Sequence, residues 1–244
     1  AISGSRPLRR WARISASVQQ LLALSPDRVA LYGYAHVPWM SRRQQMIPSD
    51  AIPKPEERLD LFDVARALFV ADGYDEIGID HFAKPSDGMA KSARAGTLRR
   101  TFQGYTDDTA PVLIGLGASS ISRFPQGYAQ NASGTADHTR AIRAGQFSTH
   151  RGHVFFGEDK LRGRIIEALM SDFHVSRAEI LRDYPVSADQ LQAMFAAAAA
   201  AFPEMVTLDD SGLGIPPHGR PLTRMIARVF DAYDQSKAQH SAAV

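Results

Sequence analysis

Cysteine is absent from this chain of 244 residues. The absence excludes disulfides, zinc–thiolate sites, a catalytic thiol and cysteine ligands for an iron–sulfur cluster within these residues. Long apolar runs are also absent, since none approaches the roughly 18 consecutive residues that a bilayer span requires. The first arginines are not followed by an apolar segment with a small-residue cleavage site, the pattern of a secretory signal. We therefore expect a cytoplasmic protein without a membrane span.

An excess of charge of one sign is lacking as well. Lys and Arg number 28 and Asp and Glu 26, and residues 1–13 hold four of the arginines and no acid. The rest of the chain therefore carries 24 basic and 26 acidic side chains, a net charge of −2. Proteins that bind nucleic acid usually carry a basic stripe on their folded body. The balance of charge disfavours nucleic-acid binding.

The first part of the chain alternates helical and strand-like segments. Residues 1–13 show no hydrophobic period and predict an irregular leader, whereas Ile14 begins the apolar spacing of an amphipathic helix. Further helices are expected at 55–72 and 89–95, and buried strands at 28–34, 74–79 and 112–116. Such alternation is typical of βαβ units with a parallel sheet, and it predicts an α/β domain over residues 14–150.

The later part of the chain has a different pattern, which predicts a second, mostly helical domain over residues 151–244. Ser176 and Ser187 each stand three residues before a Glu or Gln, as in a capping box. Residues 209–212 (DDSG) separate two short apolar segments, as in a β-hairpin. Helices are expected at 158–170, 176–182, 187–202 and 219–237. Three helices, a hairpin and a further helix resemble a winged-helix layout.

Two histidines follow the first two expected strands. His36 lies after the first strand, and His81, beside Asp80, after the second. Ligands usually bind at the carboxyl ends of parallel strands, so both histidines could face one pocket that binds an anion, transfers a proton or holds a metal. The alternative is that each histidine closes its strand end with hydrogen bonds. A third metal ligand at a recognisable spacing is lacking, so we expect no histidine metal site.

Two further segments carry candidate binding residues. Gly115 and Gly117 are too few glycines for a dinucleotide fingerprint, and mark either a close approach of the backbone to another group or strand-end packing. Arg99 and Arg100 stand near Phe102, an arrangement that can hold a carboxylate-bearing or flat aromatic ligand. The alternative is that the arginines are solvated and the aromatic ring packs on the domain.

Three arginines, Arg220, Arg224 and Arg228, are spaced four residues apart and would share one face of the last expected helix. Nucleic-acid binding is one interpretation of such a face. Acidic residues stand nearby in the sequence, at Asp209, Asp210, Asp231 and Asp234. They favour a solvated face or a packing surface instead.

Four segments occur in the order in which a known enzyme family has them. They are residues 32–38 (YGYAHVP), 78–83 (GIDHFA), 98–106 (LRRTFQGYT) and 114–122 (IGLGASSIS) with 126–131 (QGYAQN). By these segments the chain resembles the carboxyl-terminal half of the bacterial oxygen-independent coproporphyrinogen III oxidases, also called coproporphyrinogen dehydrogenases, of the radical S-adenosylmethionine (SAM) superfamily. The Phe-Gln-Gly-Tyr segment distinguishes this family from the related haem chaperones.

The resemblance extends from about Ile14 to the last helix, while residues 1–13 do not match. A frameshift or a mis-called start would explain the mismatch, and the upstream DNA should then encode a Cys-x-x-x-Cys-x-x-Cys segment roughly 150 codons before Ala1. As a fold, the resemblance implies the closing βα units of a partial TIM-like radical SAM barrel, followed by a small winged-helix-like domain.

The resemblance also implies an activity, the oxidative decarboxylation of two propionates of coproporphyrinogen III to vinyl groups, which gives protoporphyrinogen IX in haem biosynthesis. In the family a [4Fe–4S] cluster on three cysteines cleaves SAM to a deoxyadenosyl radical, a second SAM is bound, and an external acceptor takes an electron. The sequence does not identify that acceptor. The full-length enzyme is expected to be a monomer, and this chain, without the cluster cysteines, is expected to be inactive alone.

Site residues follow from the resemblance by position. Ala35 matches a contact to the SAM bound at the cluster, with Tyr32 in the same loop, and Ile121 matches a contact to the second SAM. Phe102, Gln103 and Ile121 match positions important for activity. None of these assignments requires a metal ligand in this chain.

Four residues are our own candidates for binding substrate carboxylates: His36, His81, Arg99 and Arg100. The alternative function is a porphyrin- or haem-binding protein that uses the same pocket without redox chemistry. A winged-helix protein that binds nucleic acid is the third interpretation.

Overall fold

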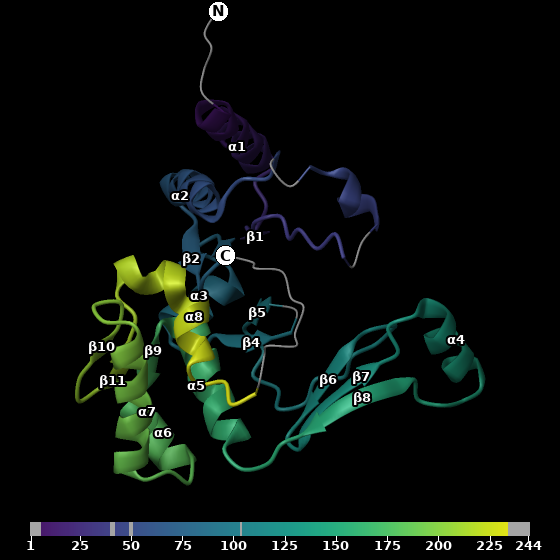
Figure 1. Cartoon of the computed structure of the whole chain (residues 1–244), viewed down its shortest axis with the longest axis vertical. Helices are drawn as coiled ribbons and strands as arrows, with labels where there is room; N and C mark the ends of the chain where they lie inside the picture. Colours follow the sequence, from purple (N-terminus) through teal and green to yellow (C-terminus); the bar gives the residue numbers. More distant parts are fainter. Residues whose placement is uncertain (1–5, 40–41, 49–50, 103, 234–244) are drawn as a thin grey trace, which may run out of the picture.

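The computed structural model describes residues 6–39, 42–48, 51–102 and 104–233. Four parts follow one another along the chain: two long helices with a small sheet, a short helix with a hairpin, a projecting ribbon, and a helical unit (Figure 1). Within the described ranges, no helix has the length and apolar character needed to cross a membrane.

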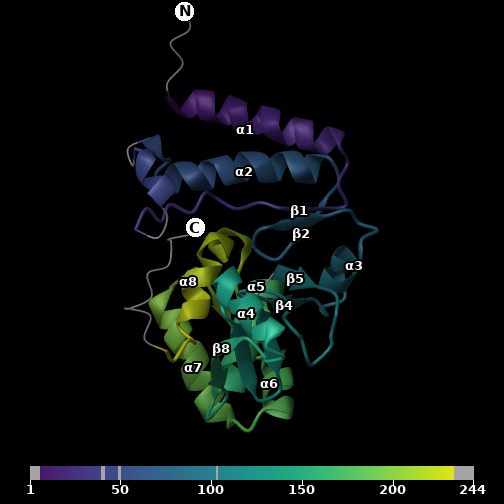
Figure 2. The same cartoon turned by 90° about the vertical axis from the view of Figure 1, so that its right-hand side faces the viewer.

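Two long helices cover the first sheet. α1 (Arg6–Ala23) and α2 (Pro55–Ala71) lie side by side above β1 and β2 (Figure 2). The proline that begins α2 sits in the first helical turn, where its missing N–H leaves no bond unmade. Val18 and Phe69 are buried in one apolar cluster, and the ring of Phe69 stacks on that of Phe82 at a centroid distance of 4.8 Å. The stripe that predicted these helices therefore faces the sheet.

The expectation of an irregular leader is wrong for residues 6–13, which form the first turns of α1. The contacts of Arg10 explain why these residues are ordered in a helix. Its Nη1 bonds Oε2 of Glu57 at 2.7 Å, and its Nη2 donates to the carbonyl oxygen of Ala51 at 2.9 Å. These partners lie 47 and 41 residues away, so a local hydrophobic period could not reveal them.

The first sheet is antiparallel, which corrects the expected parallel pairing. β1 (Arg28–Ala30) and β2 (Asp75–Ile77) both pair with β3 (His81–Ala83), which lies between them and runs opposite to both. β3 falls in a segment expected to be a loop. Gly78 has a φ of +57°, which permits the tight turn from β2 to β3, and a Cβ there would overlap the ring of Tyr105. The chain therefore returns at once as a hairpin.

A short helix and a second hairpin follow. α3 (Gly88–Arg94), expected from the sequence, is capped by Asp87, whose carboxylate accepts a hydrogen bond from the backbone N–H of Met89. β4 (Arg99–Thr101) and β5 (Gly104–Thr106) form an antiparallel pair. This hairpin carries the arginines and the aromatic residue that the sequence singled out.

The third expected strand, residues 112–116, is wrong as a strand, because the pairing there is the single bridge between Leu113 and Arg123. The side chains of Ile114 and Leu116 are exposed, so their apolar character does not reflect a buried strand. An antiparallel ribbon follows instead and projects from the rest of the chain (Figure 1). We call it the arm; it consists of β6 (Ile121–Phe124), β7 (Gly127–Asn131), α4 (Thr135–Arg143) and β8 (Thr149–Val154).

The last part has the element order and sheet of a winged helix, as expected. Three helices precede a hairpin, and β11 pairs with both β10 and β9. The side chain of Ser187 and that of Gln190 cap each other's backbone N–H groups, so this capping box is confirmed. At the other expected box, the hydroxyl of Ser176 accepts a hydrogen bond from the backbone N–H of Glu179 and caps α6. We call residues 159–230 the winged-helix unit. Its elements are α5 (Asp159–Asp172), β9 (His174–Ser176), α6 (Arg177–Asp183), α7 (Ala188–Ala201), β10 (Thr207–Leu208), β11 (Gly212–Gly214), η3 (Pro217–Leu222) and α8 (Thr223–Arg228).

The last expected helix, 219–237, is shorter than expected. A 3₁₀ turn, η3, precedes α8, and Pro221 within η3 lacks the N–H that a continuous α-helix would use. Residues 234–237 lie outside the described residues. The expected domain boundary near residue 150 stays a prediction, and β8, which spans it, pairs with β7 of the arm.

Candidate functional site

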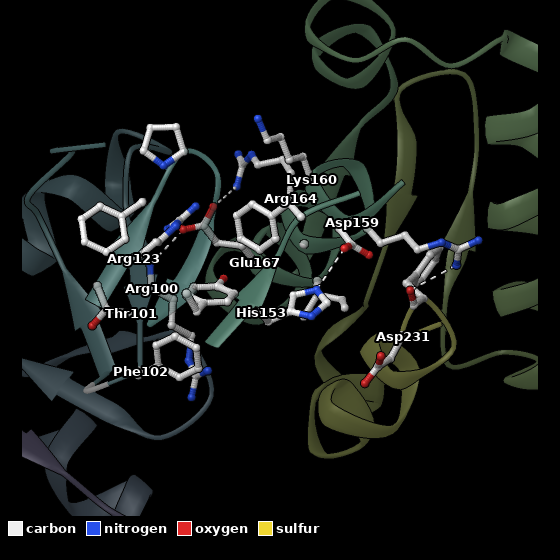
Figure 3. Close-up of a pocket in the computed structure, with 18 of the residues that line it drawn as sticks. Arg100, Thr101, Phe102, Arg123, His153, Asp159, Lys160, Arg164, Glu167 and Asp231 are labelled. Carbon is white, nitrogen blue, oxygen red and sulfur yellow. Dashed lines mark hydrogen bonds and ion pairs between the residues drawn. The ribbon is translucent and has the colours of Figure 1, made fainter. Parts of the chain in front are cut away.

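A cavity of about 850 Å³ lies between the arm, the hairpin β4–β5 and α5 (Figure 3). Aromatic rings and charged groups make up much of its lining. The rings are Phe102, Phe124, Tyr128, His153, Phe155, Tyr184, Phe230 and Tyr233. The charged side chains are Arg100, Arg123, Asp159, Lys160, Arg162, Arg164, Glu167 and Asp231.

Three rings in edge-to-face contact form the apolar wall of this cavity. The centroid of Phe102 lies 4.8 Å from that of Tyr128, and Tyr128 lies 4.9 Å from Phe155. Burial raises the pKa of the Tyr128 hydroxyl, so this ring stays neutral at physiological pH. Phe102 is 57% exposed although it is one of the largest apolar side chains of the hairpin. The wall therefore offers free aromatic surface to a ligand.

Arg100 brings a positive charge to the same cavity. Its backbone N–H donates to Oε1 of Glu167 at 3.1 Å, and its guanidinium lies over the ring of Tyr105, 5.5 Å from the centroid. Its Nε is buried and has no hydrogen-bond partner among the described residues. A buried donor without a partner costs about 1–3 kcal/mol. A carboxylate bound in the cavity would satisfy it.

Arg164 of α5 lies deeper and is held in place by two carboxylates. Its Nε bonds Oε1 of Glu179 at 2.6 Å, and its Nη1 bonds Oε2 of Glu167 at 3.3 Å. Burial acts against the charge, but the hydrogen bond and the charge of Glu179 outweigh it and raise the pKa of Arg164. Glu167 therefore links Arg164 to the backbone of Arg100, and fixes the hairpin against α5.

The opposite end of the cavity holds a contact among three polar side chains. The hydroxyl of Tyr233 lies 2.9 Å from both carboxylate oxygens of Asp159, and His153 Nε2 lies 3.1 Å from Oδ2. The backbone N–H of Phe156 lowers the pKa of Asp159 most, and Tyr233 and His153 add to this effect. Asp159 thus joins the arm to α5 and to the segment after α8.

Of the residues assigned by resemblance, Phe102 lines the cavity. Ile121 begins β6 and pairs with Gln130, and is not among the described lining residues. A Cβ at Gly115 would lie 2.8 Å from the Ile121 backbone, so this glycine permits packing of the chain on itself, the simpler of its two interpretations. Gln103 lies outside the described residues.

The loop after β1 holds Tyr32, Ala35 and His36 away from the cavity. The side chain of Gln44 fixes the loop, accepting from the backbone N–H of Val37 at 2.5 Å and donating to the Ala35 carbonyl oxygen at 3.2 Å. Tyr32 is exposed, and the His36 ring lies near that of Tyr34. The Nδ1 atom of His36 is buried without a hydrogen-bond partner in the described chain. This unmet group marks the loop as a second place where a ligand could bind.

His81 and Arg99 also lie outside the described lining of the cavity. His81 bonds Asp80 (Nδ1 to Oδ1, 2.6 Å) and packs edge-on against Tyr105, whereas His36 contacts Tyr34. The two histidines therefore have separate surroundings, and His81 fits the interpretation of a hydrogen-bonded strand end. The expectation of one shared pocket finds no support in these contacts.

Sequence reasoning missed the residues of α5. Glu167, Arg164 and Asp159 were covered by the prediction of a helix, on which charged residues are usually solvated. The side chains of Arg164 and Glu167 are only 11% and 12% exposed, which the helical pattern alone does not reveal. The described residues contain no group of three or more His, Asp or Glu that could hold a metal ion.

Comparison with known proteins identifies the class first. The solved structure of coproporphyrinogen III oxidase from Escherichia coli, described as a radical SAM enzyme, matches 92% of this chain and 52% of its own, with a TM-score of 0.84 and 30% identity. The mixed α/β fold of this chain is therefore that of about half of a radical SAM enzyme. No family model matches the chain.

Curated relatives define the family. An oxygen-independent coproporphyrinogen III oxidase of Paracoccus denitrificans is 64% identical over 95% of this chain and 51% of its own length. One of Cereibacter sphaeroides is 59% identical over 91% and 50%, and one of Thermostichus vulcanus 35% identical over 95% and 72%. The chain belongs to the oxygen-independent coproporphyrinogen III oxidase family. It spans about half the length of the Paracoccus and Cereibacter relatives.

Proposed function

We propose that this chain supplies tetrapyrrole-binding surfaces to an enzyme that oxidatively decarboxylates two propionates of coproporphyrinogen III to vinyl groups. Membership of the family supports the reaction class. Coproporphyrinogen III is broad and apolar at its centre and carries carboxylates at its edge. A site for it needs both aromatic surface and cations, and the cavity beside the hairpin β4–β5 has both.

The observation that carries this proposal is that Arg100 of β4 and Phe102 of the following turn both line the cavity. The exposed ring of Phe102 would lie against the macrocycle, while the unpartnered Nε of Arg100 would donate to a propionate. Arg123 and Lys160 lie at the same cavity and add positive charge (Figure 3). Arg99, His36 and His81 stay secondary candidates for propionates.

The cofactors of the family fit this chain unequally. The three cysteines of a [4Fe–4S] cluster are not among these 244 residues, so no step is assigned to a cluster here. SAM fits better: we propose that the loop of Tyr32 and Ala35 contacts one SAM, because the buried Nδ1 of His36 beside it lacks a partner. By position, we assign Ile121 to a contact with a second SAM, and Phe102, Gln103 and Ile121 to the positions important for activity. SAM supplies the hydrogen-abstracting group of the family's reaction.

The remaining partners are also proposals. An external acceptor of unidentified nature takes the electron, and the whole enzyme acts as a monomer in the cytoplasm without nucleic acid. The chain on its own is expected to bind the tetrapyrrole and to lack oxidase activity.

Titration of the chain with coproporphyrin III, the stable oxidised analogue, tests the proposal by fluorescence. We expect Arg100→Gln and Phe102→Ala each to weaken binding about tenfold, the loss of one charge-assisted hydrogen bond or one aromatic contact. Arg140→Gln, on the exposed face of α4, is the matched control and should bind as the parent chain does. Equal affinity of all variants would contradict the proposal, and tighter binding of haem than of coproporphyrin III would favour the redox-inactive binding protein.

A further inference from the structure

An arginine of the winged-helix unit reaches the turn between β2 and β3 of the first sheet. Arg224 of α8 donates from Nη2 to Oδ2 of Asp80 at 2.7 Å, across 144 residues of sequence. The other oxygen of the same carboxylate, Oδ1, bonds Nδ1 of His81 at 2.6 Å. The side chain of Asp80 is only 10% exposed, so these two contacts take the place of water around its charge.

Asp80 also ties together the segments that the family resemblance singled out. Its carbonyl oxygen accepts a hydrogen bond from the backbone N–H of Leu31 at 2.8 Å, directly before the loop of Tyr32 and Ala35. The next residue, His81, packs edge-on against Tyr105 with ring centroids 5.0 Å apart. Asp80 therefore connects three elements: its backbone carbonyl bonds the residue after β1, and its carboxylate bonds His81 of β3 and Arg224 of α8.

The bond to Asp80 determines what His81 can offer to a ligand. A carboxylate accepts, so Nδ1 of His81 carries the hydrogen and Nε2 is left for another partner. Nε2 faces the turn between β4 and β5, because a Cβ at Gly104 would lie 3.3 Å from it. Gly104 has a φ of +128°, a second reason for glycine at this position. The same turn carries Phe102 of the cavity.

We propose that Arg224 is a positioning residue for the substrate site. It holds the carboxylate of Asp80 in the orientation that keeps His81 protonated at Nδ1, and His81 then presents Nε2 at the β4–β5 turn to a propionate of the tetrapyrrole. The winged-helix unit is thereby part of the binding site rather than an appended domain. This inference rests on the proposed function for the identity of the ligand, but not for the arrangement of the three side chains.

The tautomer of His81 provides a test that needs no ligand. In nitrogen-15 NMR spectra of the chain at alkaline pH, where imidazoles are neutral, we expect the pattern of a single Nδ1-protonated ring for His81. Arg224→Gln should shift this pattern toward a mixture of tautomers, and Arg224→Lys should partly restore it. Arg228→Gln, an exposed change in the same helix, should leave it unchanged. An unaltered tautomer in Arg224→Gln would overturn the proposal.

Binding of coproporphyrin III gives the second readout. We expect Arg224→Gln to weaken binding about tenfold, about 1.4 kcal/mol, and to have no further effect in a chain that already carries His81→Gln or Asp80→Asn. Additive losses in these double variants would overturn the positioning role. Should Arg224→Gln fail to fold, Asp80→Asn alone must produce the same tautomer change and loss of affinity. Failure of the parent chain to bind coproporphyrin III would refute the proposed function, while the NMR result would still decide the role of Arg224.

Discussion

The winged-helix unit and the arm use apolar residues in opposite ways. Fifteen buried apolar residues form the core of the unit, and Leu169, Phe195 and Ile226 have no exposed surface at all. In the arm, α4 has no buried residue, and the side chain of Phe147 is 96% exposed. The unit supplies its own core from adjacent helices, whereas the arm is held by the backbone bonds of an antiparallel ribbon.

This contrast separates the residues that stabilise the chain from the surfaces that are free to contact other molecules. A core that is filled by its own side chains becomes less stable with every methylene group that is deleted, since little can move into the space that is left. An exposed apolar side chain contributes little to folding, and a group of them usually marks a surface that contacts something else. Val154, Phe156 and Phe102 are also exposed apolar side chains, and Phe102 lines the cavity.

The largest effect is expected from the core of the unit. Phe195 of α7 is fully buried, and its ring lies 6.4 Å from that of Phe230. Phe195→Ala should lower the free energy of unfolding by about 3–5 kcal/mol, because it removes apolar contact and leaves a cavity. Urea denaturation followed by circular dichroism measures the change. A loss below about 1 kcal/mol would show that the unit is not the rigid part of the chain.

A smaller loss is expected from the buried charges that join the unit to the hairpin. Arg164→Met removes the partner of Glu179 and Glu167, and should lower the free energy of unfolding by about 2–3 kcal/mol, below the figure for fully buried pairs because Glu179 is 28% exposed. Arg140→Met is the matched control in the arm, where the ion pair with Asp137 is exposed on both sides. It should change stability by less than about 0.5 kcal/mol. Similar losses in both variants would remove the contrast between the two regions.

The junction of arm and unit should be sensitive to acid. The pKa of Asp159 lies below its ordinary value, mainly through the Phe156 N–H, with His153 and Tyr233 contributing. The resulting stability is therefore present above the ordinary carboxyl pKa and is lost as pH falls through the lower value of the folded state. Asp159→Asn has no such proton to gain. Urea denaturation from neutral pH to about pH 3 should show a smaller dependence on pH in the variant than in the parent chain; parallel curves would contradict this account.

The sequence predicted the fold of the winged-helix unit better than that of the arm. The first three helices of the unit and the capping residues of α6 and α7 were predicted correctly, because a helix and its caps depend on neighbours three or four positions away. β3 and the arm were not, because β3 also pairs with β1, more than 50 residues earlier, and β7 pairs with β8 beyond α4, and neither partner leaves a local pattern. Gly78, which turns β2 into a hairpin, carries no local signal that distinguishes it from a helix or strand boundary.

The candidate site shows a similar limit. Arg100 and Phe102 were predicted from their types and spacing, and both line the cavity. Glu167 and Arg164 were missed, since nothing in a helical pattern tells which of its charges faces another element. The contact between Arg224 and Asp80 joins residues 144 apart, and the sequence favoured a solvated or packing face for that arginine. Residue types indicate which chemistry a side chain can perform, but which other side chains it contacts is determined by the three-dimensional arrangement.

The smallest effect on stability is expected at the tip of the arm. Phe147→Ser should change the free energy of unfolding by less than about 0.5 kcal/mol, since a ring that is 96% exposed has little contact to lose. The same change should reduce self-association at high protein concentration, measured by analytical ultracentrifugation, because it removes the most exposed large apolar side chain of the arm. If Phe147→Ser instead destabilised the chain as much as Phe195→Ala, this ring would be covered in solution, and the arm would have a packed partner surface of its own.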